Sequence, residues 1–428
     1  MDITIEPREQ LLGQIRVPGD KSISHRALIF SSIVEGTVEI EGLLEAEDPL
    51  STYKCLLGLG VEFNGNWNRL MVKGKGLRGL REPDNFLDAG NSGTTARLLL
   101  GLLAGQPFFS TLTGDNSLRK RPMGRVTEPL KEMGAFLDGR GGGTLLPLYV
   151  RGGNLTPLHY TLPVGSAQLK SALLMAALYT NGTTEIIDPF YSRDHTERMI
   201  KYLGGRIKRE NERILFETPL TLRARKIQIP GDISSASFFL IAAALAPRGE
   251  LLIEEVGINP TRTGILDVLK EMGADVKILN EREYNNEPVA DIFIKGGAPL
   301  KGVEVNANII PRLIDEIPVL AVAALFAEGE TVIKGAGELR FKETDRLSAL
   351  TLELRKMGAL IEELPDGLII KGKSGISGAC CSSQGDHRIA MSLAVAALFA
   401  RGETVIQGVE TVQISFPGFF ELLKKTTS

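Results

Sequence analysis

Polar stretches that combine serine, glycine and aspartate with basic residues recur along the chain, each directly before a long apolar segment. Serine, asparagine and aspartate are typical helix N-caps, and a helix N-terminus attracts anions through its free N–H groups and its dipole. The pattern predicts six capped helices whose starts can bind a substrate with several negative charges. The six stretches are "PGDKSISHR" (18–26), "LDAGNSGTTAR" (87–97), "VGSAQLK" (164–170), "PGDISSAS" (230–237), "RLIDEIP" (312–318) and "SSQGDHR" (382–388).

Taken singly, each stretch also fits a capped helix with solvated charges, and that alternative stays open for any one of them. The set is unevenly built, however. The Pro-Gly-Asp turn at 18–20 is followed by Lys21, His25 and Arg26, whereas the same turn at 230–232 is followed by no basic residue. This difference favours a binding role for the first turn over simple capping.

Two further stretches concentrate charge. The stretch "SLRKRPMGR" (117–125) is a basic loop around a proline, and "RFKETDRLSAL" (340–350) places Lys342, Glu343 and Arg346 within one turn at the start of a predicted helix. A solvated loop and an i,i+3 ion pair at a helix start are the simpler interpretations of these two stretches.

The composition is that of a globular protein whose charge is local rather than general. The chain has 428 residues, of which 43% are hydrophobic and 24% charged, and this length predicts two domains. A net charge of −3 argues against a nucleic-acid-binding protein. The three cysteines, Cys55, Cys380 and Cys381, are an odd number and fit reduced thiols in the cytoplasm. No apolar signal region opens the sequence and no window approaches the roughly 18 apolar residues of a membrane span, so we expect a cytoplasmic protein.

Other motif matches lack their structural context. The stretch "GLIIKGKS" (367–374) satisfies the P-loop expression, but its interior predicts a strand and no helix is predicted after it. The four histidines are scattered, without the Cys/His spacing of a zinc site. We therefore expect no metal and no cofactor.

The apolar segments belong to a six-fold repeat with a period of roughly 70 residues. In each copy an apolar helix is followed by a glycine and β-branched residues, which predicts a helix C-cap and then a strand. The glycines are Gly36, Gly105, Gly182, Gly249, Gly329 and Gly402. An amphipathic helix and a further strand follow in five copies, and the sixth ends in "FPGFFELLKK" (416–425), so we expect the N-terminal strand "DITIEP" (2–7) to complete it. The pattern indicates two halves, each with three units of mixed helix and strand.

Nine stretches together resemble the 5-enolpyruvylshikimate-3-phosphate (EPSP) synthase family, in the family's order along the chain. They are "PGDKSISHRAL", "GNSGTTARLL", "KRPMGRV", "GSAQLKSALL", "SRDHTERM", "PGDISSASFFL", "IDEIPVLAVAA", "KETDRL" and "GDHRIAMSLAVAAL", and the resemblance extends over residues 16–420. It implies a two-domain, inside-out α/β barrel with three βαβαββ units in each domain. One domain would comprise residues 1–17 and 232–428 and the other residues 18–231, with the active site in the cleft between them.

The family's reaction joins phosphoenolpyruvate to the 5-hydroxyl of shikimate 3-phosphate and releases phosphate. Both substrates carry a carboxylate and a phosphate, which suits helix N-termini and Lys/Arg side chains. The resemblance implies that shikimate 3-phosphate is bound by Lys21, Ser22, Arg26, Ser166, Ala167, Gln168, Ser192, Arg193, Asp315 and Lys342. It implies that phosphoenolpyruvate is bound by Lys21, Asn91, Gly93, Arg121, Gln168, Glu343, Arg346 and Arg388.

Three of these residues would carry the chemistry, by the same resemblance. Asp315 matches the base for the attacking 5-hydroxyl, and Glu343 matches the group that exchanges a proton with the methylene carbon of phosphoenolpyruvate. Carboxylates surrounded by positive charge should stay ionised and so be available as bases. Lys21 would act as an acid or as an electrostatic stabiliser, and the sequence leaves both roles open. We expect a monomer whose partners are the two small-molecule substrates.

The sequence departs from the family pattern near its C-terminus, and two alternative functions have to be compared with the family's reaction. The lysine that many members carry before the C-terminal Phe-Pro is absent from "VQISFPGFF" (412–420). A sister enzyme that transfers enolpyruvyl to a UDP-linked amino sugar usually has a Lys-Asn pair at the opening turn and a loop cysteine. Here Lys21 is followed by Ser22, and Cys55 lies in a predicted helix. A non-catalytic scaffold or anion-binding protein would not need Asp315 and Glu343 among its basic residues.

Overall fold

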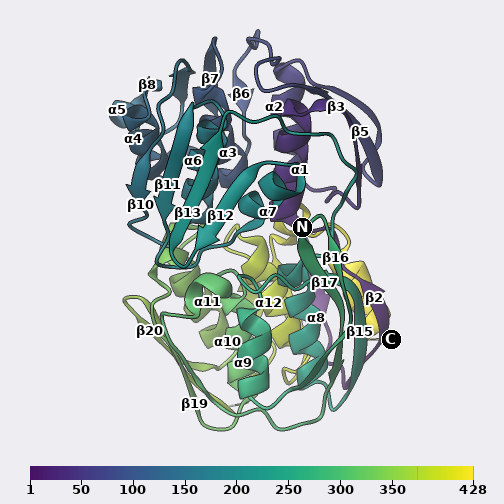
Figure 1. The fold of residues 1–428 in the computed structure, drawn as a ribbon. Helices are drawn as coiled ribbons and strands as arrows, with labels where there is room; N and C mark the ends of the chain where they lie inside the picture. The colour runs from purple at the N-terminus through teal and green to yellow at the C-terminus, as the bar shows by residue number, and fades with distance from the viewer. Residues whose placement is uncertain (374, 428) are drawn as a thin grey trace. The chain divides into compact units, whose positions relative to one another are not determined.

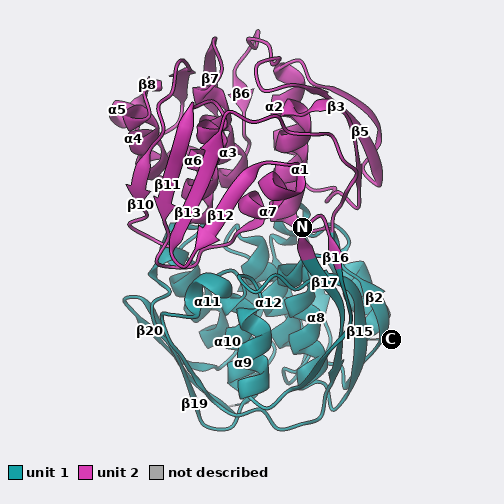
Figure 2. Cartoon of the chain, viewed as in Figure 1, with its two compact units in different colours: residues 1–18, 230–282, 288–428 teal, residues 19–229, 283–287 magenta. Residues whose placement is uncertain are grey.

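The computed structural model describes residues 1–373 and 375–427, drawn as a ribbon in Figure 1. The chain forms two compact units (Figure 2). Unit 1 consists of Met1–Pro18, Pro230–Arg282 and Pro288–Ser428, and unit 2 of Gly19–Ile229 with Glu283–Glu287. The chain passes from one unit to the other directly beside each Pro-Gly-Asp turn.

Both units repeat one pattern of elements: a strand, an apolar helix, a central strand, an amphipathic helix and a two-stranded hairpin. The sheets of unit 2 have the strand orders β14 (Ile227–Gln228), β3 (Glu35–Glu41), β5 (Arg69–Lys75), β4 (Glu62–Asn66); β6 (Leu87–Asp88), β7 (Phe109–Thr113), β9 (Leu148–Arg151), β8 (Phe136–Gly139); and β10 (His159–Thr161), β11 (Gly182–Ile187), β13 (Arg213–Thr218), β12 (Arg206–Glu210). In unit 1, the first sheet has the strand order β16 (Asp275–Tyr284), β17 (Glu287–Lys295), β15 (Arg248–Gly257), β2 (Gln10–Arg16). The second sheet has the order β18 (Glu304–Val305), β19 (Glu330–Ile333), β21 (Gly367–Lys371), β20 (Leu360–Leu364). The third sheet has three strands, in the order β1 (Asp2–Ile5), β23 (Thr404–Gln407), β22 (Cys380–Ser382).

The pairing directions are the same in all six sheets. The central strand of each sheet pairs in parallel with one strand and antiparallel with another, as β7 does with β6 and β9. In four sheets the parallel partner is the strand before the apolar helix of the same unit, whereas β3 pairs with β14 and β15 with β2, so these two partners are exchanged. In the last sheet the antiparallel partner of β23 is β1, with Asp2 opposite Gln407. The N-terminal strand therefore takes the place that the second hairpin strand has in the other five sheets.

The helices alternate between two types. The apolar helices are α1 (Lys21–Ile33), α3 (Gly93–Ala104), α6 (Ala167–Ala177), α8 (Ile233–Leu245), α10 (Ile317–Phe326) and α12 (His387–Ala397). The others are α2 (Glu47–Gly58), α4 (Gly124–Glu132), α5 (Arg140–Gly143), α7 (His195–Tyr202), α9 (Gly264–Glu271), α11 (Arg346–Lys356) and α13 (Phe419–Thr426), with short 3₁₀ turns at Leu118–Lys120, Ile310–Arg312, Gly337–Phe341 and Val409–Ile414.

The apolar helices form the core of each unit, and the sheets lie outside them. In unit 1, α8, α10 and α12 pack against one another and are buried on nearly every side. Figure 1 shows these helices in the interior of the unit, with β15–β17 and β19–β20 around them. A helix that is apolar all round must be buried, which explains why the alanine- and leucine-rich runs form the inside of the fold. The predicted inside-out α/β architecture of six βαβαββ-type units is confirmed.

The predicted caps are present at five of the six apolar helices. The side chains of Asp20, Ser92, Ser166, Asp232 and Asp386 each accept a backbone N–H in the first turn of α1, α3, α6, α8 and α12. At α10 the N-cap residue is Glu316, whose side chain makes no capping bond. The helix starts are thus built by the residues that the sequence pattern singles out.

The predicted role of the turn glycines as helix C-caps is wrong for most of the repeats. Gly105 is the C-cap of α3, but Gly36 and Gly249 already lie in strands β3 and β15. A Cβ on Gly249 would lie 2.0 Å from the carbonyl oxygen of Ala243. Glycine is required there because the strand passes directly against the end of the helix, not because the helix ends in a left-handed residue.

The strand interpretation of the P-loop match is confirmed. Gly367–Lys371 form β21, which pairs antiparallel with β20 and β19. Ser374, the last residue of the match, lies outside the described residues. A loop that cradles phosphates between a strand and a helix is therefore not formed by residues 367–373.

Candidate active site

The start of α1 carries a lysine held by a carboxylate of the neighbouring helix. Nζ of Lys21 lies 2.9 Å from Oδ2 of Asp48, and the two side chains are 17% and 9% exposed. Asp48 is in the first turn of α2. A cation that is this well enclosed yet still reachable from solvent can exchange its carboxylate partner for a ligand anion.

Arg26, one turn further along α1, is fully buried and joins three helices. Its Nε donates to Oγ1 of Thr196 in α7 at 2.7 Å, and its Nη2 donates to Oγ of Ser171 in α6 at 2.6 Å. Nη1 donates to the carbonyl of Ser22 at 2.8 Å. Burial lowers the pKa of Arg26 to about 10, against the opposing effect of Glu197 and other carboxylates, so the guanidinium stays charged near neutral pH.

A second group of donors surrounds the start of α3. Arg121 donates from Nη2 to Oδ1 of Asn91 at 2.7 Å and from Nη1 to the carbonyl of Asn91 at 3.2 Å. Gly93 is the first residue of α3, and a Cβ there would lie 2.7 Å from Nη1 of Arg97. A side chain at this position would therefore displace the end of the Arg97 side chain.

The start of α6 is tied to the start of α3 by side-chain amide bonds. Gln168 accepts from Nη1 of Arg97 at 2.7 Å and donates to Oγ1 of Thr94 at 2.9 Å. Ser166 caps the helix by accepting from the backbone N–H of Leu169 at 3.3 Å, and Ala167 is the first helical residue. The candidate residues of α3 and α6 thus form one hydrogen-bonded surface in unit 2.

Ser192 and Arg193 lie in the turn between β11 and α7. The backbone N–H and the hydroxyl of Ser192 both donate to Oδ2 of Asp188, at 3.0 and 2.9 Å. Ser192 is buried, whereas Arg193 is partly exposed. Because both donors of Ser192 are directed at Asp188, Arg193 is the better placed of the two to donate to an anion.

In unit 1, one buried guanidinium holds three carboxylates. Arg346 begins α11 and is 2% exposed; its Nε lies 2.7 Å from Oδ2 of Asp386, its Nη2 lies 2.6 Å from Oε2 of Glu343, and its Nη1 lies 3.3 Å from Oδ1 of Asp315. Burial opposes the charged form, but the carboxylates outweigh it and raise the pKa of Arg346. The arrangement fixes Asp315 and Glu343 on one rigid cation.

Two further basic residues converge on Asp315. Nζ of Lys342 lies 3.2 Å from Oδ1 of Asp315, and Nη1 of Arg388 donates to the carbonyl oxygen of Asp315 at 2.9 Å. Arg388 is in the first turn of α12, and Asp315 lies directly before Glu316, the N-cap residue of α10. The i,i+3 ion pair predicted as the simple interpretation of residues 340–350 also exists, as Arg346 to Glu343, and is part of this cluster.

Several residues of these clusters lie in the sequence motifs but have no predicted binding or catalytic role. Arg97 bridges Gln168 and the carbonyl of Pro122, and Asp386 both caps α12 and pairs with Arg346. Asp48, which pairs with Lys21, carries no motif signal at all. Asp386 could have been predicted from the sequence, because it is a carboxylate directly before an apolar helix and that helix carries an arginine.

His25 and Cys55 are structural in this fold. Nδ1 of His25 is 2.7 Å from Oγ1 of Thr52, and burial together with Lys21 and Arg26 lowers the pKa of His25 well below its ordinary value. Cys55 lies in α2, where burial raises the pKa of its thiol to about 12. Neither side chain is suited to acid–base or nucleophilic chemistry near neutral pH.

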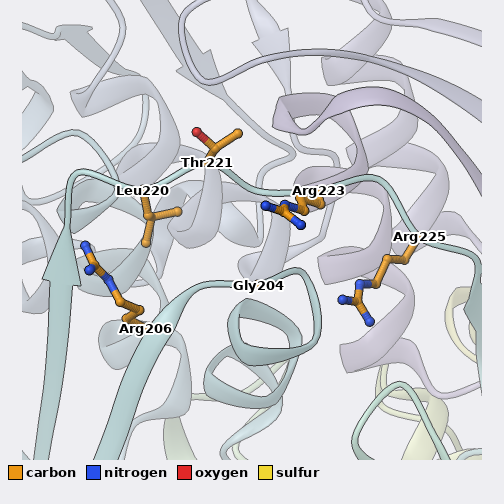
Figure 3. A pocket seen from close by; sticks show the side chains of 6 residues that line it. All are labelled: Gly204, Arg206, Leu220, Thr221, Arg223 and Arg225. Carbon is orange, nitrogen blue, oxygen red and sulfur yellow. The ribbon is translucent and has the colours of Figure 1, made fainter.

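A hollow of about 360 Å³ lies elsewhere in unit 2. Figure 3 shows its lining, which is Gly204, Arg206, Leu220, Thr221, Arg223 and Arg225. None of the candidate site residues lines it. Among the described residues, no group of three or more His, Cys, Asp or Glu side chains is placed to hold a metal ion. A search of the same residues for a helix of sufficient length and apolarity to cross a bilayer finds none.

The fold and the two clusters define a two-unit α/β protein that gathers helix N-termini, lysines and arginines for small polyanions and positions two carboxylates beside them. The sequence profile of the family described as EPSP synthase (3-phosphoshikimate 1-carboxyvinyltransferase) matches residues 5–423. A 3-phosphoshikimate 1-carboxyvinyltransferase of Desulforamulus reducens is 52% identical over 426 residues, which is 99% of each chain, and one of Pelotomaculum thermopropionicum is equally similar. The solved EPSP synthase of Acinetobacter baumannii superposes with a TM-score of 0.90 at 43% identity, covering 100% of this chain and 98% of that one. This chain belongs to the EPSP synthase family.

Proposed function

We propose that this chain transfers the enolpyruvyl group of phosphoenolpyruvate to the 5-hydroxyl of shikimate 3-phosphate and releases phosphate, a step of aromatic amino-acid biosynthesis. One observation carries the proposal: a single buried guanidinium, that of Arg346, holds both Asp315 and Glu343. The reaction takes a proton from a hydroxyl and exchanges another at a carbon atom, so it needs two separately positioned acid–base groups. A scaffold or passive anion-binding protein needs neither.

The basic residues divide between the two substrates in this proposal. Lys21, Arg26 and Arg193, with the start of α6, bind shikimate 3-phosphate. Lys21 also reaches phosphoenolpyruvate, which the donors around Asn91 and the arginines of unit 1 hold. The remaining members of the two sets are Ser22, Ser166, Ala167, Gln168, Ser192, Asp315 and Lys342 for shikimate 3-phosphate, and Gly93, Arg121, Gln168, Glu343, Arg346 and Arg388 for phosphoenolpyruvate.

The chemistry then takes two steps. The 5-hydroxyl oxygen bonds to the central carbon of phosphoenolpyruvate as its proton passes to the ionised Asp315. The methylene carbon gains a proton from Glu343, which must therefore enter this step protonated, unlike Asp315. In the second step the carbon–oxygen bond to phosphate breaks, Glu343 takes a proton back from the methyl group, and the enol ether forms. The proton on Asp315 leaves with the phosphate, so that Asp315 is restored. Lys21 stabilises the charge of the departing phosphate.

The proposal is tested by phosphate release from phosphoenolpyruvate with shikimate 3-phosphate as acceptor, and with UDP-N-acetylglucosamine in parallel. We expect turnover with shikimate 3-phosphate alone, and turnover with the sugar nucleotide alone would refute the proposal. Asp315→Asn and Glu343→Gln should each lower kcat by about 10²–10⁴. Glu362→Gln is the matched control, because Glu362 is an exposed carboxylate of β20 in the same unit.

A matched pair in unit 2 tests the phosphoenolpyruvate contacts. Arg121→Gln removes the donors that hold Asn91 and should raise the KM for phosphoenolpyruvate. Arg223→Gln should leave it unchanged, because Arg223 is exposed and, within the described chain, its side chain makes no hydrogen bond or ion pair. Equal effects of the two substitutions would indicate a general loss of positive charge rather than loss of a specific contact.

We also propose that the protein acts as a cytoplasmic monomer. The absence of a candidate membrane helix in the described residues is compatible with this. Light scattering coupled to gel filtration gives the mass in solution, and a dimeric mass would refute the monomer.

A further inference from the structure

A buried lysine of unit 2 has no role in the proposed chemistry. Lys170 lies in the first turn of α6 and is fully buried. Its Nζ is 2.9 Å from Oδ2 of Asp188, 2.8 Å from Oε1 of Glu197 and 2.8 Å from the carbonyl oxygen of Ser192. Of its three N–H donors, one bonds Asp188 and one bonds the carbonyl of Ser192, while Glu197 is an ion-pair partner without a hydrogen bond.

The acceptors of Lys170 belong to the turn that leads into α7. Oδ2 of Asp188 also accepts from the N–H and the hydroxyl of Ser192, and Arg209 lies 3.5 Å from the same oxygen. Tyr191, inside the turn, has a φ of +49°, and the guanidinium of Arg209 lies 4.6 Å from the centre of its ring. A bulky residue with a positive φ is uncommon and persists only where its surroundings fix it. The turn 188–192 is therefore held in one conformation by contacts centred on Asp188.

Lys170 connects this turn to the helix start that carries the other candidate residues. It follows Gln168 in α6, and its bond to the carbonyl of Ser192 ends one residue before Arg193. Moving an unpaired ammonium ion into the protein interior costs several kcal/mol. An apolar residue of similar length at position 170 of α6 would be buried without that cost. The charge of Lys170 is therefore explained by the turn 188–192 that it holds, rather than by a gain in stability.

We propose that Lys170 is a positioning residue for shikimate 3-phosphate: it fixes the turn 188–192 against α6, so that Arg193 and the Ser166–Gln168 helix start present one rigid set of donors. Lys170 does not touch the substrate. This inference rests on the proposed function. It accounts for the burial of Ser192, whose donors maintain the turn.

The decisive variant is Lys170→Met combined with Glu197→Gln. Lys170→Met alone leaves two buried carboxylates with one fewer cation and is expected to be poorly stable. In the double variant Asp188 keeps Arg209 and both donors of Ser192, so the turn retains its internal bonds and loses its connection to α6. Because Glu197 also acts on Arg26, Glu197→Gln alone is measured beside it and should bind shikimate 3-phosphate more tightly than the double variant. Asp188→Asn is a second variant, in which Lys170 remains neutralised by Glu197. Lys201→Met, at an exposed lysine of α7, is the matched control.

The measurements are the KM for each substrate by phosphate release, and the Kd for shikimate 3-phosphate alone by calorimetry. We expect the KM and Kd for shikimate 3-phosphate to rise about tenfold or more in the double variant, which corresponds to loss of about 1.4 kcal/mol of binding. The KM for phosphoenolpyruvate should stay at the wild-type value, a split that general destabilisation would not produce.

Two outcomes separate the inference from the function on which it rests. A folded double variant that binds shikimate 3-phosphate as tightly as the wild type overturns the inference and leaves the function intact. A wild-type protein that neither binds nor turns over shikimate 3-phosphate overturns both. Similar losses in the double variant and in Lys201→Met would also overturn the inference, because Lys201 has no part in the network.

Discussion

Substitutions of Arg346 test whether one guanidinium positions the acid–base residues of unit 1. The side chain is 2% exposed and holds Asp386, Glu343 and Asp315 at 2.7, 2.6 and 3.3 Å. Arg346→Lys keeps the charge but loses the planar fork, and Arg346→Met removes the charge but keeps an unbranched stem. The two variants therefore separate geometry from charge.

The methionine variant should lose stability. Removal of one partner from a buried ion pair costs about 3–5 kcal/mol, and we expect a loss of that size in the free energy of unfolding at mildly alkaline pH. The carboxylates around Arg346 raise its pKa above the unfolded value despite burial. For a basic group with a raised pKa, the stabilisation is complete below the unfolded pKa and is lost only as the pH rises through the folded pKa. The contribution in the wild type is thus constant below about pH 12, whereas the methionine variant should recover stability in acid as its carboxylates take up protons.

The lysine variant should fold but react slowly. A single ammonium group cannot span three carboxylates that a planar guanidinium holds from different directions, so Asp315 and Glu343 lose their common support. Loss of one preorganised electrostatic contact typically costs about 10²–10³ in kcat, and we expect a decrease of that order. Phosphate release gives kcat and KM, and urea unfolding followed by circular dichroism gives the stability.

The control for both variants is Arg355, an exposed arginine of the same helix whose guanidinium donates to the carbonyl oxygen of Ile361. Arg355→Lys and Arg355→Met should leave kcat unchanged. The reasoning is refuted if folded Arg346→Lys has the wild-type kcat, or if Arg346→Met is as stable as Arg355→Met at alkaline pH.

Three further predictions concern Gly93, His25 and the cysteines. In Gly93→Ala the new Cβ would lie 2.7 Å from Nη1 of Arg97, so that side chain must move, and steady-state kinetics should show a higher KM for phosphoenolpyruvate. Burial and neighbouring cations lower the pKa of His25, so the unfolded chain takes up the proton first. As the pH falls below about 6.5, the stability measured in urea should decrease by up to about 1.4 kcal/mol per pH unit from this group, and His25→Gln should remove that slope. A chromogenic thiol reagent should label the exposed Cys380 in the native protein but Cys55, whose thiol pKa is about 12, only after unfolding, and Cys55→Ser should keep the wild-type kcat.

Each of these predictions has an outcome that contradicts it. An unchanged KM in Gly93→Ala would mean that Arg97 moves away at no functional cost. Equal acid slopes in the wild type and in His25→Gln would mean that the histidine titrates normally in the folded protein. Loss of turnover on labelling or replacing Cys55 would favour the sister enzyme with a catalytic cysteine.

The helix starts were predictable because their determinants are local. An apolar run and a serine or aspartate immediately before it set both the helix and its cap, as at Ser92 and Asp386. The six-fold repeat was visible for the same reason, since each copy has the same order of helix, strand and turn. The pairing of β2 with β15 and of β14 with β3 could not be predicted, because these strands are distant in the sequence and have only seven and two residues. The sequence of so short a strand does not specify which strand it pairs with.

The partners of the site residues were not predictable from the sequence. Lys21 pairs with Asp48, and His25 bonds Thr52, 27 residues away in each case. Contacts of this kind depend on which helices pack together, and nothing near Asp48 distinguishes it from a solvated carboxylate at a helix start. The same holds for Lys170, whose position in an otherwise apolar helix would also fit a lysine at the edge of the core.

The two Pro-Gly-Asp turns have the same backbone arrangement but differ in whether the neighbouring cation is accessible to a ligand. Asp20 and Asp232 each cap the helix that follows. Behind the second turn, Arg262 is 3% exposed and donates to Asp232 at 3.2 Å, so the cation that the sequence lacks locally comes from another segment and is buried. At the first turn the cation is Lys21, which is partly exposed and pairs with Asp48. The two carboxylates are equally enclosed, with 9% of each side chain exposed, but Lys21 is 17% exposed and Arg262 only 3%. A substrate phosphate can therefore reach Lys21 from solvent, whereas Arg262 would have to be approached in the protein interior. The position of the counter-cation, rather than the turn itself, therefore determines which copy can bind an anion.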